Sequence, residues 1–224
     1  MSKTLFHYVH HAAFWLEFEG KRALFDPFLE GNPEGIKAEE ISADWILLSH
    51  AHEDHVGDAF EIARRSNSLI ISTAEVCALA RSEGCRAHSM HIGGTFVFDF
   101  GKLRIVPAFH GSGVEGGHAC GFIVNFYGTR LYYAGDTGLF GDMKWLRDVE
   151  PFDTAVLPIG GNFTMNPDDA ALACEWLSVP SVIPVHYNTW PVIAQNPNNF
   201  KMKVEGAGKT KVLLPQPGET IELI

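Results

Sequence analysis

The chain has 224 residues, of which 46% are hydrophobic and 20% are charged, so it is long enough to bury a sizeable core. Its formal net charge is −10, and no cluster of Lys or Arg offsets it, which makes nucleic acid an unexpected partner. No Ser/Pro-rich linker or abrupt change in composition marks a boundary. We therefore predict a single domain over residues 1–224.

The hydrophobic segments are short. No run approaches the roughly 18 consecutive apolar residues that a membrane helix needs, and the first residues lack the apolar stretch of a signal peptide. We expect a cytoplasmic protein with no membrane partner, which can form a homo-oligomer. Its four cysteines form no CxxC pair and are predicted to be free thiols in or near the core; they are Cys77, Cys85, Cys120 and Cys174.

The first third of the chain begins with β-rich runs at 5–9, 14–18 and 22–25, which predict an antiparallel meander. Residues 44–49 form a nearly continuous apolar run, typical of a strand buried on both faces, and this run ends at His50. Helices are then predicted over 58–65 and 73–83, with a strand at 69–71 between them.

The remainder repeats this order. Strands at 95–100, 103–109, 121–127 and 130–134 predict two consecutive hairpins. A helix over 139–149, a strand at 154–157, a helix over 167–177 and a strand at 181–185 follow, with Asn166 as N-cap and Pro167 in the first turn. Two sheets packed face to face with helices outside accommodate this order, so we predict an α/β (α+β) fold built as a four-layer αββα sandwich.

Four metal-ligand side chains lie within the six residues 50–55, directly after the predicted buried strand. Imidazole nitrogens together with a carboxylate suit a first-row transition ion such as Zn, Mn, Fe or Ni. Six residues cannot all face one ion. We expect alternation along an extended turn to direct His50 and His52 to one cation, and Asp54 and His55 to a second.

Further ligands must come from elsewhere in the chain. His110, Asp136 and His186 each follow an apolar strand, as His50 does. A lone histidine at a strand end is more often a hydrogen-bonded structural residue. Beside the 50–55 cluster, however, the three residues together predict that four strand ends converge at one edge.

This pattern, HxHxDH followed by a distant His, a Gly-Asp and a final His, resembles the metallo-β-lactamase superfamily. The resemblance covers nearly the whole chain. More specific strings resemble the UPF0173 (YtkL-like) group, which is related to the ascorbate-6-phosphate lactonases. They are Phe-Asp-Pro-Phe at 25–28, Ala-Gly-Asp-Thr-Gly-Leu-Phe-Gly-Asp-Met at 134–143, Leu-Pro-Ile-Gly-Gly-Asn-Phe-Thr-Met at 157–165 and Pro-Val-His-Tyr-Asn-Thr at 184–189.

The resemblance implies the metallo-β-lactamase fold with two divalent metal ions at one edge of the sheets, zinc foremost and Mn, Ni or Fe as alternatives. It assigns His50, His52 and His110 to the first metal, Asp54, His55 and His186 to the second, and Asp136 to a bridging position. Asp54, Asp136 and His186 are then the catalytic candidates. A hydroxide shared by the metals would attack a small ester, lactone or phosphoester, anionic substrates included.

Substrate contacts are predicted from loops near these ligands. Asn162 lies in a Gly-Gly-Asn-Phe loop before a helix N-terminus that could hold an oxyanion or phosphate. Tyr187 and Asn188 adjoin His186. His118 directly follows the glycine-rich segment 111–117, and this segment is interpreted either as a lid or as a plain connection. Trp190 is expected to pack.

The chain departs from the UPF0173 pattern at a few positions. Ala51 and Glu53 replace residues that are commonly Gly, and Glu53 is expected to be solvated rather than to hydrogen-bond a ligand imidazole. His11 stands where the group has an early His and is interpreted either as a pocket residue or as a core residue. Asp26 either orients a ligand histidine or caps a turn.

Three other functions remain open. The first is a redox or oxygen-chemistry metalloprotein on the same fold, although His52 occupies a position where a di-iron site of this fold usually has Glu. The second is a metal-dependent nuclease or phosphodiesterase, although no basic RNA-binding appendage is evident. The third is a non-catalytic metal-binding module, which the complete ligand set disfavours.

Overall fold

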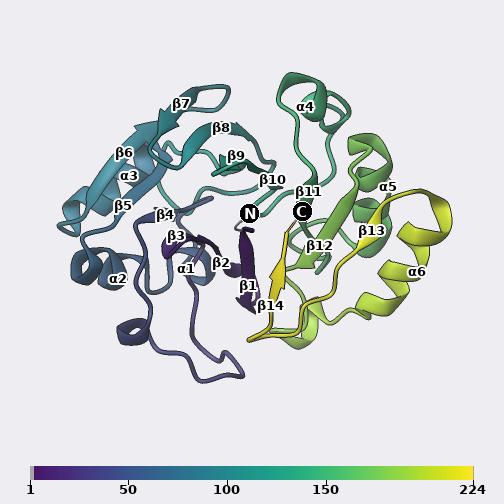
Figure 1. Ribbon diagram of the computed structural model, residues 1–224, viewed down its shortest axis with the longest axis horizontal. Helices are drawn as coiled ribbons and strands as arrows, with labels where there is room; N and C mark the ends of the chain where they lie inside the picture. The colour runs from purple at the N-terminus through teal and green to yellow at the C-terminus, as the bar shows by residue number, and fades with distance from the viewer. Residues whose placement is uncertain (1–2, 224) are drawn as a thin grey trace.

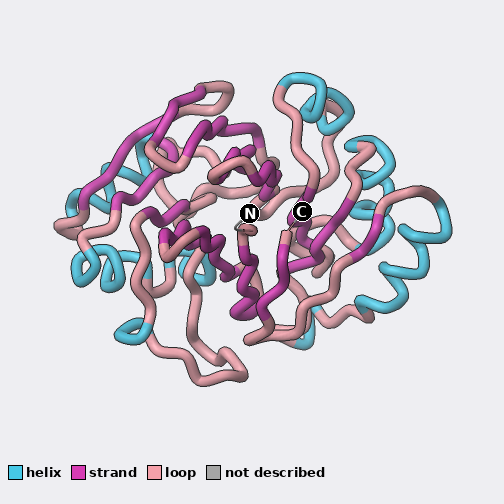
Figure 2. The backbone as a smooth tube through the Cα atoms, viewed as in Figure 1, coloured by secondary structure: helices cyan, strands magenta, loops and turns pink. Residues whose placement is uncertain are grey.

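The computed structural model describes residues 3–223, which form two seven-stranded mixed sheets (Figures 1 and 2). The first sheet has the spatial order β14-β1-β2-β3-β4-β5-β6. Its strands are β1 (Leu5–His10), β2 (Ala13–Phe18), β3 (Lys21–Phe25), β4 (Trp45–Leu47), β5 (Leu69–Thr73), β6 (Arg86–Met90) and β14 (Thr220–Glu222).

The second sheet has the order β13-β12-β11-β10-β9-β8-β7. Its strands are β7 (Thr95–Phe98), β8 (Gly101–Pro107), β9 (Cys120–Phe126), β10 (Thr129–Tyr133), β11 (Thr154–Pro158), β12 (Ser181–Val185) and β13 (Lys211–Val212). In each sheet one part is antiparallel and the other parallel. Both halves therefore run from a β-meander to β/α alternation, as the sequence predicted.

The helices pack on the outer faces of the sheets, as Figure 1 shows. In the first half they are α1 (Glu53–Val56), α2 (Ala59–Ser66) and α3 (Ala74–Ser82), and in the second half α4 (Met143–Val149), α5 (Pro167–Leu177) and α6 (Pro197–Ala207). Two short 3-10 turns, Ala38–Glu40 and Pro191–Ile193, lie in loops. No helix within residues 3–223 is long and apolar enough to span a bilayer.

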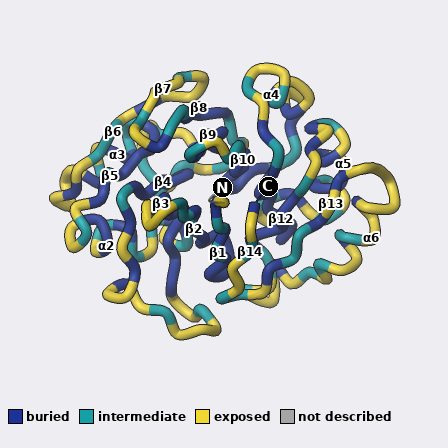
Figure 3. The backbone as a smooth tube through the Cα atoms, in the orientation of Figure 1, coloured by how far each residue is buried: buried dark blue, intermediate teal, exposed yellow. Residues whose placement is uncertain are grey.

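Three hydrophobic clusters fill the spaces between the four layers. The central cluster lies between the sheets, where Phe14 and Phe25 stack with ring centroids 4.4 Å apart and the edge of Tyr133 meets both rings. A second cluster joins α2 and α3 to the first sheet, and a third joins α4, α5 and α6 to the second sheet. Figure 3 shows the resulting buried strands and exposed outer helical surfaces. The predicted αββα sandwich is confirmed.

Several element boundaries differ from the prediction. The fourth helix begins at Met143 rather than at residue 139, because the preceding segment pairs with the loop after β8: Thr137 Oγ1 accepts a hydrogen bond from Phe109 N, and Gly138 N donates to Phe109 O. The two predicted hairpins form one four-stranded meander, since β8 also pairs with β9. Four elements, β6, β13, β14 and α6, were not predicted from the sequence.

Other details match the prediction. The Asn166 side chain accepts hydrogen bonds from Asp168 N and Asp169 N, and Pro167 opens α5, so the predicted cap is confirmed. All four cysteines are buried free thiols.

Candidate metal centre

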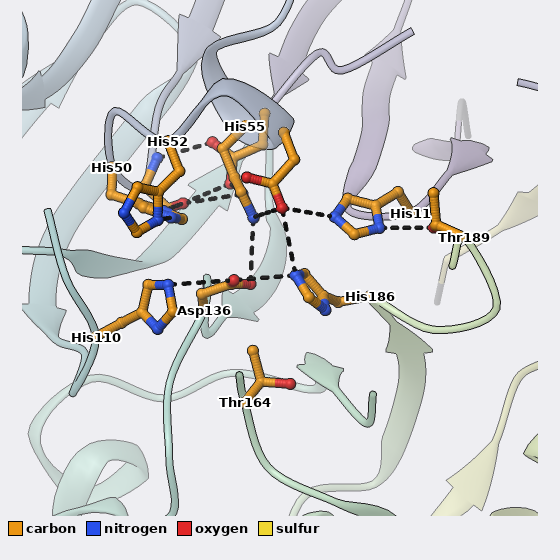
Figure 4. Close-up of polar contacts among 12 residues, drawn as sticks. His11, His50, His52, His55, His110, Asp136, Thr164, His186 and Thr189 are labelled. Carbon is orange, nitrogen blue, oxygen red and sulfur yellow. Dashed lines mark hydrogen bonds and ion pairs between the residues drawn. The ribbon is translucent and has the colours of Figure 1, made fainter. Parts of the chain in front are cut away.

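Four strand ends meet at one edge of the sandwich, and each is followed by a predicted ligand (Figure 4). His50 follows β4, His110 follows β8, Asp136 follows β10 and His186 follows β12. Backbone hydrogen bonds between the segments fix this arrangement: Cys120 N donates to Ser49 O at 2.9 Å, and His186 N donates to His11 O at 2.8 Å. Ligands from distant parts of the sequence are thus brought together by the sheets themselves.

The segment after His50 is a helical turn, which corrects the expected extended turn. Residues 53–56 form α1, with His52 as its extended N-cap residue. In a helix successive side chains are rotated by about 100°, so Asp54 and His55 leave the backbone in directions different from that of His52. The division of the segment into two groups arises from this rotation and not from β-like alternation.

The first group consists of His50, His52 and His110. One ring nitrogen of each lies within 4.8 Å of the others. His50 Nε2 and His52 Nδ1 are 2.9 Å apart, and the His110 ring packs edge-on against both rings. Three imidazoles that converge in this way form an all-nitrogen site of the kind a divalent transition ion occupies.

The second group consists of His11, Asp54, His55 and His186, again with ligand atoms within 4.8 Å of one another. Asp54 Oδ2 lies 3.3 Å from His11 Nε2, 3.8 Å from His186 Nε2 and 3.9 Å from His55 Nε2. His11, for which the sequence left two interpretations, therefore belongs to the site. Its Nδ1 is 2.7 Å from Thr189 Oγ1, which fixes the ring orientation.

Asp136 lies between the two groups. Its Oδ1 is 3.3 Å from His55 Nε2, and its Oδ2 is 3.0 Å from His186 Nε2 and 3.6 Å from His110 Nε2. The carboxylate is almost fully buried. The two oxygens of this one carboxylate thus face histidines of both groups, as the oxygens of a carboxylate shared by two cations would.

Asp26 orients two of the histidines through their Nδ1 atoms, one directly and one through Ser49. Its Oδ2 lies 2.7 Å from His55 Nδ1 and accepts hydrogen bonds from Tyr133 Oη and Ser49 Oγ, both at 2.5 Å. Ser49 Oγ is in turn 2.9 Å from His50 Nδ1. Engaging the Nδ1 atoms leaves the Nε2 atoms to face the centre of the site. Of the two interpretations of Asp26, the orienting one agrees with these contacts.

The electrostatics of the site combine burial with close opposite charges. Burial alone would lower the pKa of His55 and His186, but Asp136 opposes it, aided by Asp26 at His55 and by Asp54 at His186. The pKa of His186 rises to about 9, and that of His55 lies well above its ordinary value. For His11 burial outweighs the hydrogen bond to Asp54 and lowers the pKa to about 4.

Several ligand atoms are buried without a hydrogen bond. Within residues 3–223, His55 Nε2, Asp136 Oδ1 and His186 Nε2 have no hydrogen-bond partner, although they lie close enough for charge pairing. Buried polar atoms are nearly always satisfied, so such a concentration points to a missing partner. All three face the same centre, and a cation is the partner to which imidazole nitrogens and carboxylate oxygens donate lone pairs. The residues therefore fit a metal.

Backbone conformation is unusual at three of these residues. His11, Asp26 and His186 have φ values of 52°, 39° and 57°, in the left-handed region that non-glycine residues seldom adopt. Each lies just past a strand end, where a sharp change of direction aims the side chain into the site. Such conformations persist when surrounding contacts hold them, and they concentrate at functional sites.

A pocket of about 550 Å³ opens onto the ligands. It is lined by His52, Glu53, Asp54, His110, Asp136, Phe163, His186, Trp190 and Val192. Trp190 packs against His11 and Phe28, as expected, but it is also 38% exposed and lines this pocket. Phe163, which was not singled out from the sequence, lines it too. Figure 4 also shows Thr164 beside Asp136 and His186. Only the Gly-Gly-Asn-Phe-Thr motif signalled this loop in advance.

The four residues predicted to contact the substrate do not line this pocket. Asn162 and His118 are exposed and do not line the pocket. Tyr187 and Asn188 line a neighbouring cavity of about 450 Å³ instead, and Asn188 Oδ1 accepts a hydrogen bond from Gln195 N within its own loop. The residues next to a ligand in sequence point elsewhere because the loop turns sharply at His186 and Asn188.

The loop at 111–117 is fastened to the ligand segment. Ala51 N donates to Ser112 O at 2.7 Å, and a Cβ at Gly113 would come within 2.5 Å of Ala51 C. Glycine is therefore required at Gly113 for close approach, which favours a connection that supports His52 over a free lid. Glu53, as expected, is exposed, and it lies at the pocket mouth.

Comparison with known proteins agrees with this geometry. A family model described as a beta-lactamase superfamily domain matches residues 21–187. A UPF0173 metal-dependent hydrolase of Natranaerobius thermophilus is 47% identical over 217 residues, covering 96% of this chain and 98% of that protein. The structure of Igni18, a metallo hydrolase from Ignicoccus hospitalis, is 35% identical with a TM-score of 0.91 and covers 99% of both chains.

A more distant structure shares the fold alone. CmlA, a diiron β-hydroxylase from Streptomyces venezuelae, is 14% identical, with a TM-score of 0.78 over 100% of this chain and 55% of CmlA. The sandwich and the ligand-bearing strand ends define a protein of the metallo-β-lactamase fold. The family model and the identity over nearly the whole length go further: the chain belongs to the beta-lactamase superfamily and, within it, to the UPF0173 metal-dependent hydrolases.

Proposed function

We propose that the chain is a hydrolase that holds two divalent cations, zinc foremost, and cleaves a small ester, lactone or phosphoester. The observation that carries this proposal is Asp136, whose buried carboxylate lies between the two groups of histidines, and His55 Nε2 and His186 Nε2 beside it have no hydrogen-bond partner. The relatives named metal-dependent hydrolases support the same activity.

The ligands divide between two positions. His50, His52 and His110 would hold one cation, and Asp54, His55 and His186 the other, with Asp136 shared. When bound, the cations would supply an activated water and polarise the carbonyl or phosphoryl group whose carbon or phosphorus is attacked. No Ser or Cys nucleophile is then needed.

The chain's own residues orient these groups and the attacking water. Asp26 holds the His55 ring, and Thr189 holds the His11 ring. Asp54 has a side chain that is 28% exposed and reaches the pocket. Against the effect of burial, hydrogen bonds from His11 and His186 lower its pKa, so the ionised carboxylate can orient the attacking water by accepting a hydrogen bond from it. Phe163, Trp190 and Val192 limit access of bulk water from the pocket side.

The proposal is tested by hydrolysis of 4-nitrophenyl acetate and a panel of lactones and phosphodiesters by the purified protein. Removal of metal, His50→Ala or Asp136→Asn is expected to lower kcat/KM at least 100-fold, while circular dichroism shows a retained fold. His91→Ala, at an exposed histidine outside the site, serves as the matched control and should change nothing. Full activity of the metal-free protein would refute the proposal, and iron with oxygen-dependent activity would favour redox chemistry.

A further inference from the structure

The rim of the metal pocket is apolar and exposed. Phe163, Trp190 and Val192 line the same pocket as the ligands, and they are 53%, 38% and 55% exposed. Large apolar side chains grouped at a pocket mouth are typical of a surface that another molecule covers. The three come from two loops, Phe163 after β11 and the other two after β12.

The backbone of the two loops that carry these side chains is fixed by contacts within the chain, and so is the Trp190 ring. The Trp190 ring meets His11 edge-on, with centroids 5.0 Å apart. Its loop is closed by hydrogen bonds from Ile193 N to Trp190 O and from Asn188 N to Ile193 O. Phe163 follows the turn at Asn162, whose φ is 49°. A pre-formed apolar surface loses little conformational entropy on binding, which favours its use as a binding site.

Away from the proposed cations, the described residues of the pocket wall offer no positively charged side chain to a negatively charged substituent of the substrate. No Lys or Arg occurs among the described residues that line it, whereas Glu53 stands at its mouth beside Asp54. Proteins that bind phosphate or carboxylate groups usually supply Arg, Lys or a free helix N-terminus. The N-terminus of α5 has no free N–H group at Asp168 or Asp169, because the Asn166 side chain already accepts hydrogen bonds from both. The side chains of Asp168 and Asp169 also add negative charge there.

We propose that the substrate is an uncharged carboxylic ester or lactone with an apolar alkyl or aryl group. Phe163, Trp190 and Val192 cover that group while the carbonyl carbon faces Asp54 and Asp136. This inference rests on the proposed hydrolase function and narrows it. Water oxygen bonds to the acyl carbon, the bond from that carbon to the alkoxy oxygen breaks, the alkoxy oxygen takes one proton, and a carboxylate and a second proton are released.

The test compares three 4-nitrophenyl esters that share a leaving group: the acetate, the octanoate and the anionic hemisuccinate. The wild-type protein is expected to prefer the octanoate to the acetate in kcat/KM by at least tenfold, and to cleave the hemisuccinate more slowly than the acetate. Phe163→Ala and Val192→Ala should each lower the octanoate-to-acetate ratio by about fivefold, since each removes apolar contact area of the bound chain. Val97→Ala, an exposed apolar residue on β7, is the matched control and should leave the ratio unchanged.

Glu53→Gln tests the charge argument separately. It is expected to raise the hemisuccinate-to-acetate ratio several-fold, because one repelling carboxylate is lost. Equal cleavage of acetate and octanoate, or preference for the hemisuccinate, would overturn the inference while metal-dependent cleavage of the acetate leaves the hydrolase proposal intact. Absence of metal-dependent cleavage of all three esters would overturn both.

Discussion

At the scale of single residues, Asp26 determines how the histidines are presented. It has no access to solvent, and its two oxygens contact Ser49, Tyr133 and His55. These contacts engage His55 Nδ1 directly and His50 Nδ1 through Ser49. One carboxylate outside the ligand set thus orients a histidine of each group.

Replacing this carboxylate should weaken metal binding. Asp26→Asn keeps the shape of the side chain but removes its charge, so we expect the affinity for zinc to fall roughly 10- to 100-fold. Competition with a chromophoric chelator measures the affinity. Tyr133→Phe, which removes one hydrogen bond to Asp26 and keeps the carboxylate, should have a smaller effect. Unchanged affinity in Asp26→Asn would show that Asp26 only stabilises the fold.

The protonation of His186 predicts a proton release. Its pKa is raised to about 9 in the metal-free protein, because the effect of Asp136 exceeds that of burial. It therefore carries a proton at pH 7, which a cation must displace. Zinc added to weakly buffered metal-free protein should release protons at pH 7 and fewer above pH 9, as an indicator dye would report. Zinc binding without proton release at pH 7 would contradict this.

The raised pKa of His186 also makes the stability of the metal-free protein depend on pH. Because the folded pKa of His186 exceeds the ordinary 6.5, its interaction with Asp136 stabilises the fold fully below pH 6.5 and is lost as the pH rises through about 9. Urea unfolding of wild type and His186→Gln should therefore differ more at pH 6 than at pH 10. A difference that grows with rising pH would have the wrong sign.

The candidate ligands in residues 50–55 and at the later strand ends could be proposed from the sequence, because ligand type and an apolar run are both local signals. The apolar rim was not. Phe163 and Trp190 have no local feature that separates a pocket-lining aromatic residue from a packed one, and only the two loop conformations place them.

At the scale of elements, the site depends on close approach of strand ends. Gly135 precedes Asp136 with φ of 61°, and a Cβ there would lie 2.7 Å from Cys120 O and 2.8 Å from Ser49 Cβ. No side chain fits between β10 and the segment that follows β4. This packing sets the distance between Asp136 and the histidines of the first sheet.

Gly135→Ala should therefore destabilise the protein by about 2 kcal/mol or more, since both backbone strain and overlap are introduced. Gly141→Ala lies in the same connection and meets nothing within 4 Å, so it is the matched control and should change the free energy of unfolding by less than about 0.5 kcal/mol. Chemical denaturation measures both. Equal effects would mean that the approach at Gly135 is not constrained.

Most elements with strong apolar periodicity were predicted, whereas α6 was missed despite its N-cap Asn196, and strands defined by distant pairing were not predicted. The helix at Pro167–Leu177 carries its own N-cap in Asn166. In contrast, Arg86–Met90 has little apolar character and is a strand because it pairs with β5. Thr220–Glu222 likewise depends on β1 at the other end of the chain. A short window of sequence contains no pattern that indicates such pairings.

At the scale of the whole molecule, the site joins the two sheets. His50 follows a strand of the first sheet, whereas His110, Asp136 and His186 follow strands of the second. Cations bound by both sets would link the layers across the central core. Metal binding would thereby be coupled to the stability of the whole sandwich.

Zinc should raise the melting temperature of the metal-free protein. At free zinc about 1,000 times the dissociation constant, binding adds about 4 kcal/mol to stability. Differential scanning calorimetry should show an increase that is reduced in His110→Ala, because one ligand from the second sheet is lost. An increase of the same size in that variant would show that the cations do not depend on this ligand.

The most direct test of the account is a titration of metal-free protein with zinc, in which bound metal and cleavage of 4-nitrophenyl acetate are followed together. The arrangement of two ligand groups around Asp136 predicts that hydrolysis is absent without metal and reaches its maximum at about two zinc ions per chain. Hydrolysis by the metal-free chain, or saturation of both binding and activity at one ion, would contradict it.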